Sequence, residues 1–321
     1  MQPVDVVGVG NAIVDILATT TDEFVAEQGL EKGSMSLIDA TRARQLYGLV
    51  GEAMKASGGS AANTVAGVAS FGGSAAYIGK VNDDDLGQFF AHDMNALGVE
   101  FDQTPSIGGP STAMCVVLVT PDAQRTMSTY LGVSALLEPH DVHPATVERA
   151  GYLFCEGYLW DVDSAKQAIR KAMDIARSNG SKVSLTLSDT FCIERHHREF
   201  LELVQGPVDV LFANRAELTT LYGCGLDEAV SRVAETVDLA FVTLSGDGSL
   251  IVSEGDVIEI APERVDVVDT TGAGDQYAAG VLYGLARGLP LPEVGRLGSL
   301  AAGEVISHMG PRPRRPLSEF L

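Results

Sequence analysis

The sequence has few basic residues, few cysteines and no long apolar run, and each absence excludes a class of function. Lysine and arginine number 22 against 43 aspartates and glutamates, which gives a formal net charge of −21. A chain this acidic is not expected to bind nucleic acid. No apolar run reaches the roughly 20 residues that a helix needs to cross a bilayer. The four cysteines form no C-x-x-C pair, so no cysteine metal site is expected.

The amino-terminal residues also lack the basic stretch that opens a secretory signal peptide. Together with the scattered cysteines, this favours a cytoplasmic protein whose thiols are reduced. The 321 residues are 45% hydrophobic and 20% charged, which is typical of a globular protein with a sizeable core. We therefore expect a small-molecule ligand, with neither a nucleic acid nor a membrane as partner.

Apolar strands alternate with helices along most of the chain, which predicts an α/β fold with a parallel sheet and right-handed crossovers. Strands are expected at 6–9, 75–78, 152–155, 183–187, 208–213 and 239–244, followed by two short strands before residue 265. Helices are expected at 61–71, 84–97, 164–178, 194–204 and 215–222. The later strands are apolar along their whole length, as expected where helices cover both faces of the sheet.

Two segments interrupt this alternation, at about 15–53 and about 99–133. The first is mixed in character and shows no long helical pattern at its ends. The second contains an apolar run at 112–119, a Pro-Asp turn and a further run at 125–130, which predicts a hairpin. Because no linker divides the chain, we predict one domain over 1–321 with a small β lid made from these two segments. The hairpin fits either a packed lid or a dimer edge, so a monomer or a lid-mediated homodimer is expected.

The most informative segment is Asp269-Thr270-Thr271-Gly272-Ala273-Gly274-Asp275. A short strand at 265–268 is expected to lead into it, and an alanine-rich helix to follow it as far as about Arg287. The amides at the start of a helix are unpaired and carry the positive end of its dipole, so this order predicts a phosphate site.

Asp275 would lie in the first turn of that helix, next to the predicted phosphate site. Gly272 and Gly274 lack the Cβ atoms that would keep a phosphate away from the amides. Asp275 could then take a proton from a group that attacks the phosphate. The helix terminus is expected to keep its carboxylate ionised near pH 7.

Two further strands of the second half also end in polar residues. The strand at 208–213 runs into Asn214 and Glu217, and the strand at 239–244 runs into residues 245–248. Ligands of such sheets lie beyond the carboxyl ends of the strands, so these residues are expected near Asp275. Asn214 and Glu217 equally fit a helix capping box, and residues 245–248 equally fit a plain turn.

The first half supplies a second group of polar residues. The Gly8-Val9-Gly10 run lacks a third glycine and a following acidic strand end, which disfavours a dinucleotide-binding fold. Asn11 and Asp15 are better interpreted as groups that bind substrate hydroxyls. The glycine turn at 57–63 fits a plain helix start, or a close backbone approach to a polyhydroxyl ligand that Asn63 binds.

In these motifs the chain resembles the ribokinase-like (PfkB) carbohydrate kinases over nearly its full length. The late Asp-Thr-x-Gly-Ala-Gly-Asp signature is met at 269–275, the early Gly-Gly-x-x-x-Asn turn at 58–63, and the Asn-x-x-Glu motif at 214–217. The resemblance implies a three-layer α/β/α sandwich with a mainly parallel central sheet and a small β-sheet lid. It also implies ATP-dependent phosphorylation of a hydroxymethyl group.

The resemblance further implies a role for each matching residue. Asp275 would be the catalytic base, and the amides of Gly272, Ala273 and Gly274 would form an anion hole. Asn11, Asp15, Gly59 and Asn63 would hold the substrate hydroxyls. Asn214 and Glu217 would lie near Mg²⁺ and ATP, with Glu217 acting through water, and Thr243, Ser245, Gly246 and Gly248 near the nucleotide. Asp269, Thr271 and Gly310 match places where many relatives bind a monovalent cation, so potassium is an additional expected cofactor.

Within that family the chain looks most like the adenosine kinase branch. Residues 10–16 are similar to the opening motif of that branch, and Arg125 matches a lid arginine that meets the phosphates. The implied reaction converts adenosine and ATP to AMP and ADP. A sugar kinase for ribose, fructose or a keto-deoxy sugar acid is the alternative. Trp160, the single tryptophan, fits either a stacking partner for a purine or a core residue.

Overall fold

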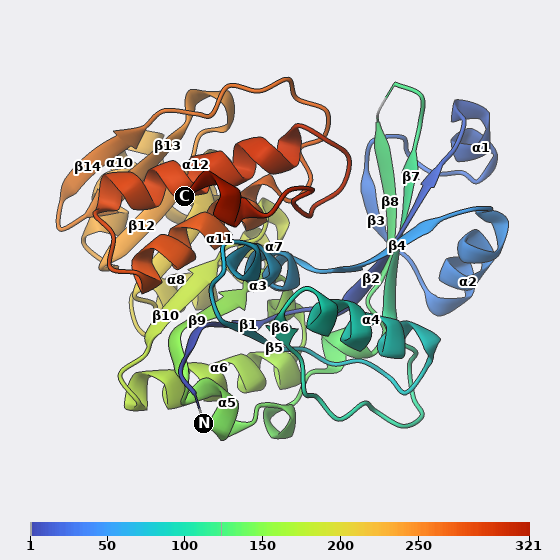
Figure 1. The fold of residues 1–321 in the computed structure, drawn as a ribbon, viewed down its shortest axis with the longest axis horizontal. Coiled ribbons are helices and arrows are strands. Elements are labelled where there is room, and N and C mark those ends of the chain that lie inside the picture. Colours follow the sequence, from blue (N-terminus) through green and yellow to red (C-terminus); the bar gives the residue numbers. More distant parts are fainter. Residues whose placement is uncertain (1, 123) are drawn as a thin grey trace.

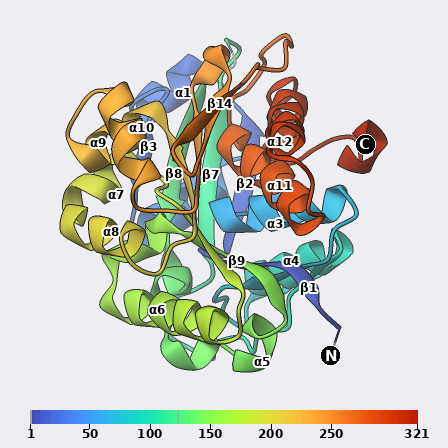
Figure 2. The same cartoon turned by 90° about the vertical axis from the view of Figure 1, so that its left-hand side faces the viewer.

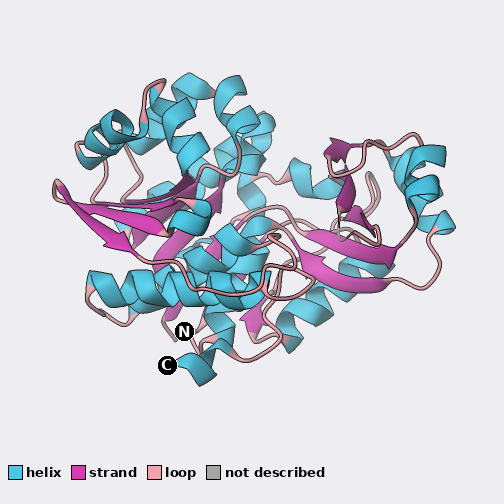
Figure 3. Cartoon of the chain, turned by 90° about the horizontal axis from the view of Figure 1, so that it is seen from above, coloured by secondary structure: helices cyan, strands magenta, loops and turns pink. Residues whose placement is uncertain are grey.

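The computed structural model describes residues 2–122 and 124–321. A large and a small β-sheet lie at the two ends of the molecule, joined by several chain crossings (Figures 1 and 3). In the described part of the chain, no helix is both long and apolar enough to span a membrane.

The large sheet has nine strands within the described residues, in the order β14-β13-β12-β11-β10-β9-β1-β5-β6. Its strands are β1 (Val4–Val9), β5 (Ala75–Ile78), β6 (Val99–Glu100), β9 (Ala150–Glu156), β10 (Lys182–Thr186), β11 (Val210–Asn214), β12 (Leu239–Thr243), β13 (Ser249–Ser253) and β14 (Asp256–Ile260). All neighbours pair in parallel except β12 with β13 and β13 with β14. The predicted mainly parallel sheet is therefore confirmed.

Helices cover both faces of this sheet, which makes the three layers (Figure 2). One face carries α5 (Pro144–Val147), α6 (Asp163–Ser178), α7 (Thr190–Arg195), α8 (His197–Val204), α9 (Arg215–Tyr222) and α10 (Leu226–Ala234). The other carries α3 (Ser60–Ser70), α4 (Asp85–Ala96), α11 (Ala273–Ala286) and α12 (Leu291–Ile306). Val6 and Val7 are neighbours in β1 yet belong to opposite core clusters, because successive side chains of a strand point to opposite faces. Burial on both faces explains the continuous apolar strands.

The small sheet has the order β3-β8-β7-β2-β4. Its strands are β2 (Ile13–Thr19), β3 (Met35–Leu37), β4 (Met54–Gly58), β7 (Ala113–Val119) and β8 (Arg125–Tyr130). The predicted hairpin is the antiparallel pair of β7 and β8. Both expected lid segments contribute strands, although β2 begins before residue 15 and β4 lies beyond residue 53.

Two helices within the first lid segment escaped sequence reasoning. They are α1 (Asp22–Glu27) and α2 (Ala40–Leu49), which lie beside the small sheet (Figure 1). In α2, Ala43 and Leu46 are the buried side chains, and Leu46 packs with Val116 and Leu118 of β7. Two buried positions in ten residues make too weak an apolar stripe to indicate a helix.

Two other expectations were wrong. Residues 265–268 form no strand: β14 is the edge of the sheet, and the chain after it runs as an irregular segment with Val267 exposed. Its backbone is held instead by Val268, whose amide donates to the carbonyl of Ile306 at 2.8 Å. The helix expected at 194–204 is two helices, α7 and α8, which break at His196, where the backbone leaves helical geometry.

The contact between α11 and α12 depends on glycine. A Cβ atom at Gly280 would lie 2.4 Å from the carbonyl oxygen of Leu297. We predict that Gly280→Ala destabilises the protein by about 2 kcal/mol, because the two helices must separate. Gly48→Ala is the matched control: it also lies in a helix, but its Cβ would meet no atom within 4 Å, so we expect an unchanged or higher stability. Urea unfolding of both variants checks this, and equal effects would contradict it.

Candidate active site

The carboxyl ends of the parallel strands open onto a cavity of about 1280 Å³ between the two sheets. Most of the residues that the sequence singled out line it: Asn11, Gly59, Asn214, Glu217, Thr243, Ser245, Gly246, Gly248, Thr271, Gly272, Ala273, Gly274 and Asp275. Residues more than 200 positions apart in the sequence thus share one cavity. Asp15, Asn63, Arg125, Asp269 and Gly310 lie outside this lining.

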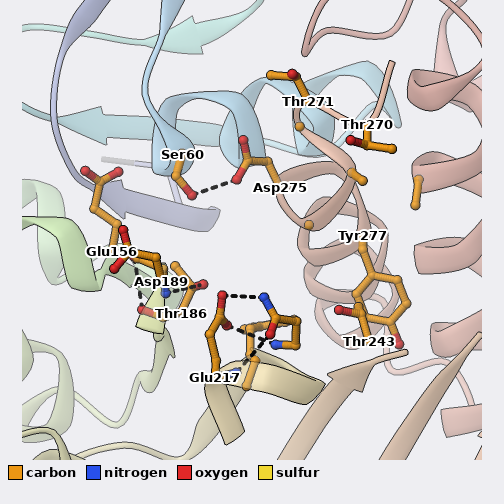
Figure 4. A pocket seen from close by; sticks show the side chains of 18 of the residues that line it. Ser60, Glu156, Thr186, Asp189, Glu217, Thr243, Thr270, Thr271, Asp275 and Tyr277 are labelled. Carbon is orange, nitrogen blue, oxygen red and sulfur yellow. Dashed lines mark hydrogen bonds between the residues drawn. The ribbon is translucent and has the colours of Figure 1, made fainter. Parts of the chain in front are cut away.

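Asp275 lies in the first turn of α11, and α3 holds its carboxylate (Figure 4). The hydroxyl of Ser60 donates to one oxygen at 2.6 Å, and the amide of Asn63 donates to the other at 2.8 Å. Asn63, which we expected to contact substrate, therefore contacts Asp275. Ser60 was missed by sequence reasoning, although it lies inside the glycine turn that the sequence singled out.

Burial affects the ionisation of Asp275 in a way that the sequence did not indicate. Burial raises the pKa of Asp275 above its usual value, while the bonds from Ser60 and Asn63 and the charge of Arg312 oppose that rise. We expected the helix terminus to keep this carboxylate ionised near pH 7, and desolvation acts in the opposite direction, towards the neutral form. A carboxylate with a raised pKa is a stronger base, and it requires a higher pH to be ionised.

The residues just before Asp275 line the cavity, and two of their amides have no partner within the described residues. Gly272 has a φ of 77°, and a Cβ atom there would lie 2.8 Å from Pro311, so glycine is required. At Gly274 a Cβ would meet no atom within 4 Å. Among the described residues the amides of Gly272 and Gly274 have no acceptor, whereas the amide of Ala273 donates to the carbonyl of Thr270 at 3.2 Å. Two of the three expected amides are thus free to bind an anion.

Glu156 is a buried carboxylate that sequence reasoning missed. It is the last residue of β9 and is 1% exposed. One oxygen accepts the backbone and side-chain amides of Asn11 at 2.8 and 2.7 Å, and the other accepts the amide of Ala61 at 2.9 Å. Burial raises the pKa of Glu156 to about 7, against the lowering effect of these bonds. Glu156 thus fixes the start of α3, which in turn carries Ser60 and Asn63.

Asn214 and Glu217 form a reciprocal capping box at the start of α9. The amide of Glu217 donates to the Asn214 side chain at 2.9 Å, and Glu217 accepts the backbone amide of Asn214 at 2.9 Å. The structural interpretation of this motif is therefore confirmed, and both side chains also line the cavity. Burial raises the pKa of Glu217 to about 7, and the nearby charge of Asp189 adds to the rise. Asp189, another lining residue, was not anticipated.

The lid arginine meets a carboxylate in this structure. Arg125 of β8 donates to Asp269, and both side chains are buried. Asp269 also accepts the amides of Thr271 at 3.0 Å and Gly310 at 2.9 Å. Two amides and a guanidinium therefore already surround the carboxylate that we matched to a monovalent cation site.

Asp15 lies behind the glycine turn rather than in the cavity wall. A Cβ atom at Gly58 would lie 2.4 Å from its carboxylate oxygen. Burial raises the pKa of Asp15 to about 7, while the charges of Arg312 and Arg125 lower it. The positive charges of two arginines therefore act on Asp15 behind the glycine turn.

Trp160 is a core residue. Its side chain is fully buried in the core, with its ring 6.0 Å from that of Phe200 and its N–H donating to Glu199 at 2.7 Å. It does not line the cavity. An apolar wall comes instead from the small sheet, from the residue after β8 and from α7: Ile13, Met35, Leu37, Met127, Leu131 and Phe191. Phe191 is 67% exposed and Leu37 61%, so these side chains are available to a ligand.

The comparisons with known proteins agree with this geometry. A model of the pfkB family carbohydrate kinases matches residues 33–317. The chain belongs to the pfkB family of carbohydrate kinases. As a member of the family, it is a sugar or nucleoside kinase, a phosphotransferase that uses an alcohol group as acceptor and ATP with a divalent metal ion.

The relatives of this chain carry the names of different substrates. The adenosine kinase from Sinorhizobium meliloti is 49% identical, with a TM-score of 0.92 over 99% of this chain and 98% of that one. A probable sugar kinase from Rhizobium etli is 46% identical, with a TM-score of 0.92 over 100% and 98% of the two chains. The 5-dehydro-2-deoxygluconokinase of Bacillus velezensis is 29% identical over 261 residues, which are 78% of this chain and 79% of the relative.

The buried carboxyl of Glu156 predicts how stability depends on pH. Its pKa in the folded protein, about 7, exceeds the value of about 4.5 expected in the unfolded chain. The folded state therefore binds the proton more tightly, and this group adds stability as the pH falls from 8 towards 5.5. We predict a smaller rise in melting temperature over this range for Glu156→Gln than for the wild type. Glu52→Gln, at an exposed position, should keep the wild-type slope. Equal slopes in all three proteins would contradict the prediction.

Proposed function

We propose that this chain phosphorylates the 5′-hydroxymethyl group of a purine nucleoside, with adenosine and ATP giving AMP and ADP. The observation that carries the proposal is the position of Asp275 on the cavity wall, flanked by the free amides of Gly272 and Gly274. A base beside an anion-binding helix start suits phosphoryl transfer to a hydroxyl. The similarity to the Sinorhizobium meliloti adenosine kinase supports the same substrate class.

The walls of the cavity favour a nucleoside over a sugar acid. The apolar side chains from the small sheet offer a surface that a purine ring can cover. Arg195 and Arg264 are the basic residues in the described lining, and Arg195 already pairs with Asp161 through two bonds of 3.0 and 2.8 Å. The lining acids are Glu156, Asp161, Asp189, Glu217, Glu263 and Asp275. A substrate carboxylate would be repelled by this field.

A keto-deoxy sugar acid is the second candidate substrate. Several curated relatives are named 5-dehydro-2-deoxygluconokinase, and others are named probable fructokinases. A sugar kinase would use the same base and the same amides. The two candidate functions therefore differ in the acceptor and share the reaction.

In the proposed reaction, Asp275 orients the acceptor hydroxyl and takes its proton as the new bond to phosphorus forms. Ser60 and Asn63 hold the carboxylate in place from α3. The amides of Gly272 and Gly274 face the negative charge of the transferring phosphoryl group. The small sheet, acting as a lid, would exclude water that could otherwise take the phosphoryl group. Asn11, Gly59 and, behind them, Asp15 would bind or orient the sugar hydroxyls.

The nucleotide would occupy the opposite end of the cavity. Asn214, Thr243, Ser245, Gly246 and Gly248 line the cavity and would hold ATP there. The oxygens of Glu217 and Asp189 suit Mg²⁺, which prefers carboxylate and water ligands, and a cation there would relieve their mutual repulsion. When bound, the ion would neutralise phosphate charge.

A substrate panel and one substitution test the proposal. ADP release with ATP and Mg²⁺ should be fastest with adenosine and slow with ribose, fructose and 5-dehydro-2-deoxygluconate. Asp275→Asn should lower turnover by a factor on the order of 10² to 10⁴ and leave the affinity for ATP nearly unchanged, since Asp275 faces the acceptor. Retained turnover would remove Asp275 from the role of base, and a preference for the sugar acid would replace the nucleoside.

We also propose that turnover needs no potassium. The residues around Asp269 do not fit a monovalent cation, because Arg125 already supplies a positive charge to that carboxylate. We expect equal rates of ADP release in potassium and tetramethylammonium chloride, and equal melting temperatures in the two salts. In Arg125→Met, potassium should raise the melting temperature, because Asp269 is then left without its cation. Strong activation of the wild type by potassium would contradict this.

A further inference from the structure

A short segment near the carboxyl terminus connects the two halves of the site. Next to Asp269, the amide of Gly310 donates to that carboxylate at 2.9 Å. Pro311 packs against Gly272, and its carbonyl accepts the side chain of Gln276 in α11 at 3.1 Å. Residues 310 and 311 therefore support the anion-binding end of α11, and Arg312 follows directly.

Arg312 then reaches the glycine turn on the acceptor side. Its guanidinium donates to the carbonyl of Ser57 at 2.7 Å, to the Ser57 hydroxyl at 3.1 Å and to the carbonyl of Ala62 at 3.1 Å. The two carbonyls lie on either side of Ser60, so one rigid fork spans the turn that holds Asp275. Arginine suits this task because its donors are fixed in one plane.

The charge of Arg312 acts on carboxylates with which it forms no salt bridge. Among the described residues it forms no salt bridge. Its hydrogen bonds go to backbone and hydroxyl oxygens and, at 3.8 Å, to the Met94 sulfur, and its Nε–H is buried without a partner. Burial lowers the pKa of Arg312 to about 10, and the charges of Asp93, Asp15 and Asp275 act in the opposite direction. At neutral pH the group is therefore a cation facing three acids.

We propose that Arg312 is a positioning residue for phosphoryl transfer, which fixes the Ser57–Ala62 turn against Asp275 and supplies the positive charge that keeps Asp275 ionised. The inference rests on the proposed function, because it assumes that Asp275 is the base. It assigns two separable contributions to one side chain. The fork sets the geometry of Ser60 and Asn63, and the charge sets the ionisation of Asp275.

The ionisable groups around Asp275 come from several elements. Arg312 lowers its pKa. Asp15 of β2, Glu156 at the end of β9 and Tyr158 just after it also interact with the charge of Asp275. Among the described residues, Arg312 is the cation whose charge favours the ionised form of Asp275.

The test is the pH dependence of kcat/KM for adenosine in four proteins: the wild type, Arg312→Met, Arg312→Lys and Arg314→Met. Arg312→Met should lower kcat and shift the acid limb of the profile towards higher pH by about one unit. Arg312→Lys should restore the limb to its wild-type position while kcat stays low, because lysine keeps the charge but cannot span both carbonyls. Arg314→Met, on the same segment with an exposed side chain, should match the wild type.

The outcomes separate this inference from a merely structural role. If Arg312 only stabilised the fold, kcat would fall without a shift of the limb, and an unmoved limb in Arg312→Met would overturn the proposal. A limb displaced equally in the Lys and Met variants would overturn it too. Repeating the comparison in an Asp15→Asn background excludes Asp15 as the titrating group, and loss of the shift there would contradict the assignment to Asp275.

Two controls keep the result interpretable. Melting curves and ATP titrations report folding, and if Arg312→Met does not fold, Arg312→Gln replaces it as the uncharged variant. Asp275→Asn distinguishes a failure of the proposed function from a failure of the role assigned to Arg312. If that variant is inactive but Arg312→Met behaves as the wild type, the proposed function stands and the role of Arg312 falls. If Asp275→Asn is active, the base itself is wrong.

Discussion

The site depends on one contact, in which the Asp275 carboxylate is held by Ser60 and Asn63. It joins α11 to α3, two helices separated by more than 200 residues in the sequence. The rest of the fold makes that contact possible. Glu156 fixes the start of α3, and Gly272 lets the chain turn tightly against Pro311. Because Asp275 and the residues that hold it come from distant parts of the chain, an intact contact requires the whole sheet to be formed.

Buried carboxyl groups dominate the electrostatics of the site. Asp15, Glu156 and Glu217 each have a pKa raised to about 7 by burial, and the chain as a whole is strongly acidic. Such a cavity attracts cations and neutral polyols and disfavours anionic acceptors. ATP would bind here together with a metal ion and to free helix amides, so that the ion neutralises part of the negative charge of the phosphates.

Much of the fold could be predicted because burial leaves a pattern in the sequence. The parallel strands are apolar throughout, and the glycine-rich turn before Asp275 is unusual enough to indicate a residue of the cavity wall. The contacts that tune the site left no such pattern. Glu156 and Arg312 act through pairings 95 and more than 200 residues away in sequence, and a single charged residue carries no local signal. Residues 265–268 were wrongly predicted as a strand because β-branched residues favour strands, whereas the amide of Val268 bonds to Ile306 at the end of α12.

The central claim is that Asp275 directs the phosphoryl group to a hydroxymethyl oxygen. The most direct measurement is the proton-coupled ³¹P spectrum of the product formed from adenosine, ATP and Mg²⁺. Phosphorus bonded through oxygen to a CH₂ group couples to two protons, so the account predicts a triplet for the new monoester. A doublet, from phosphate on a secondary hydroxyl of the ribose, or only the singlet of inorganic phosphate, would contradict it.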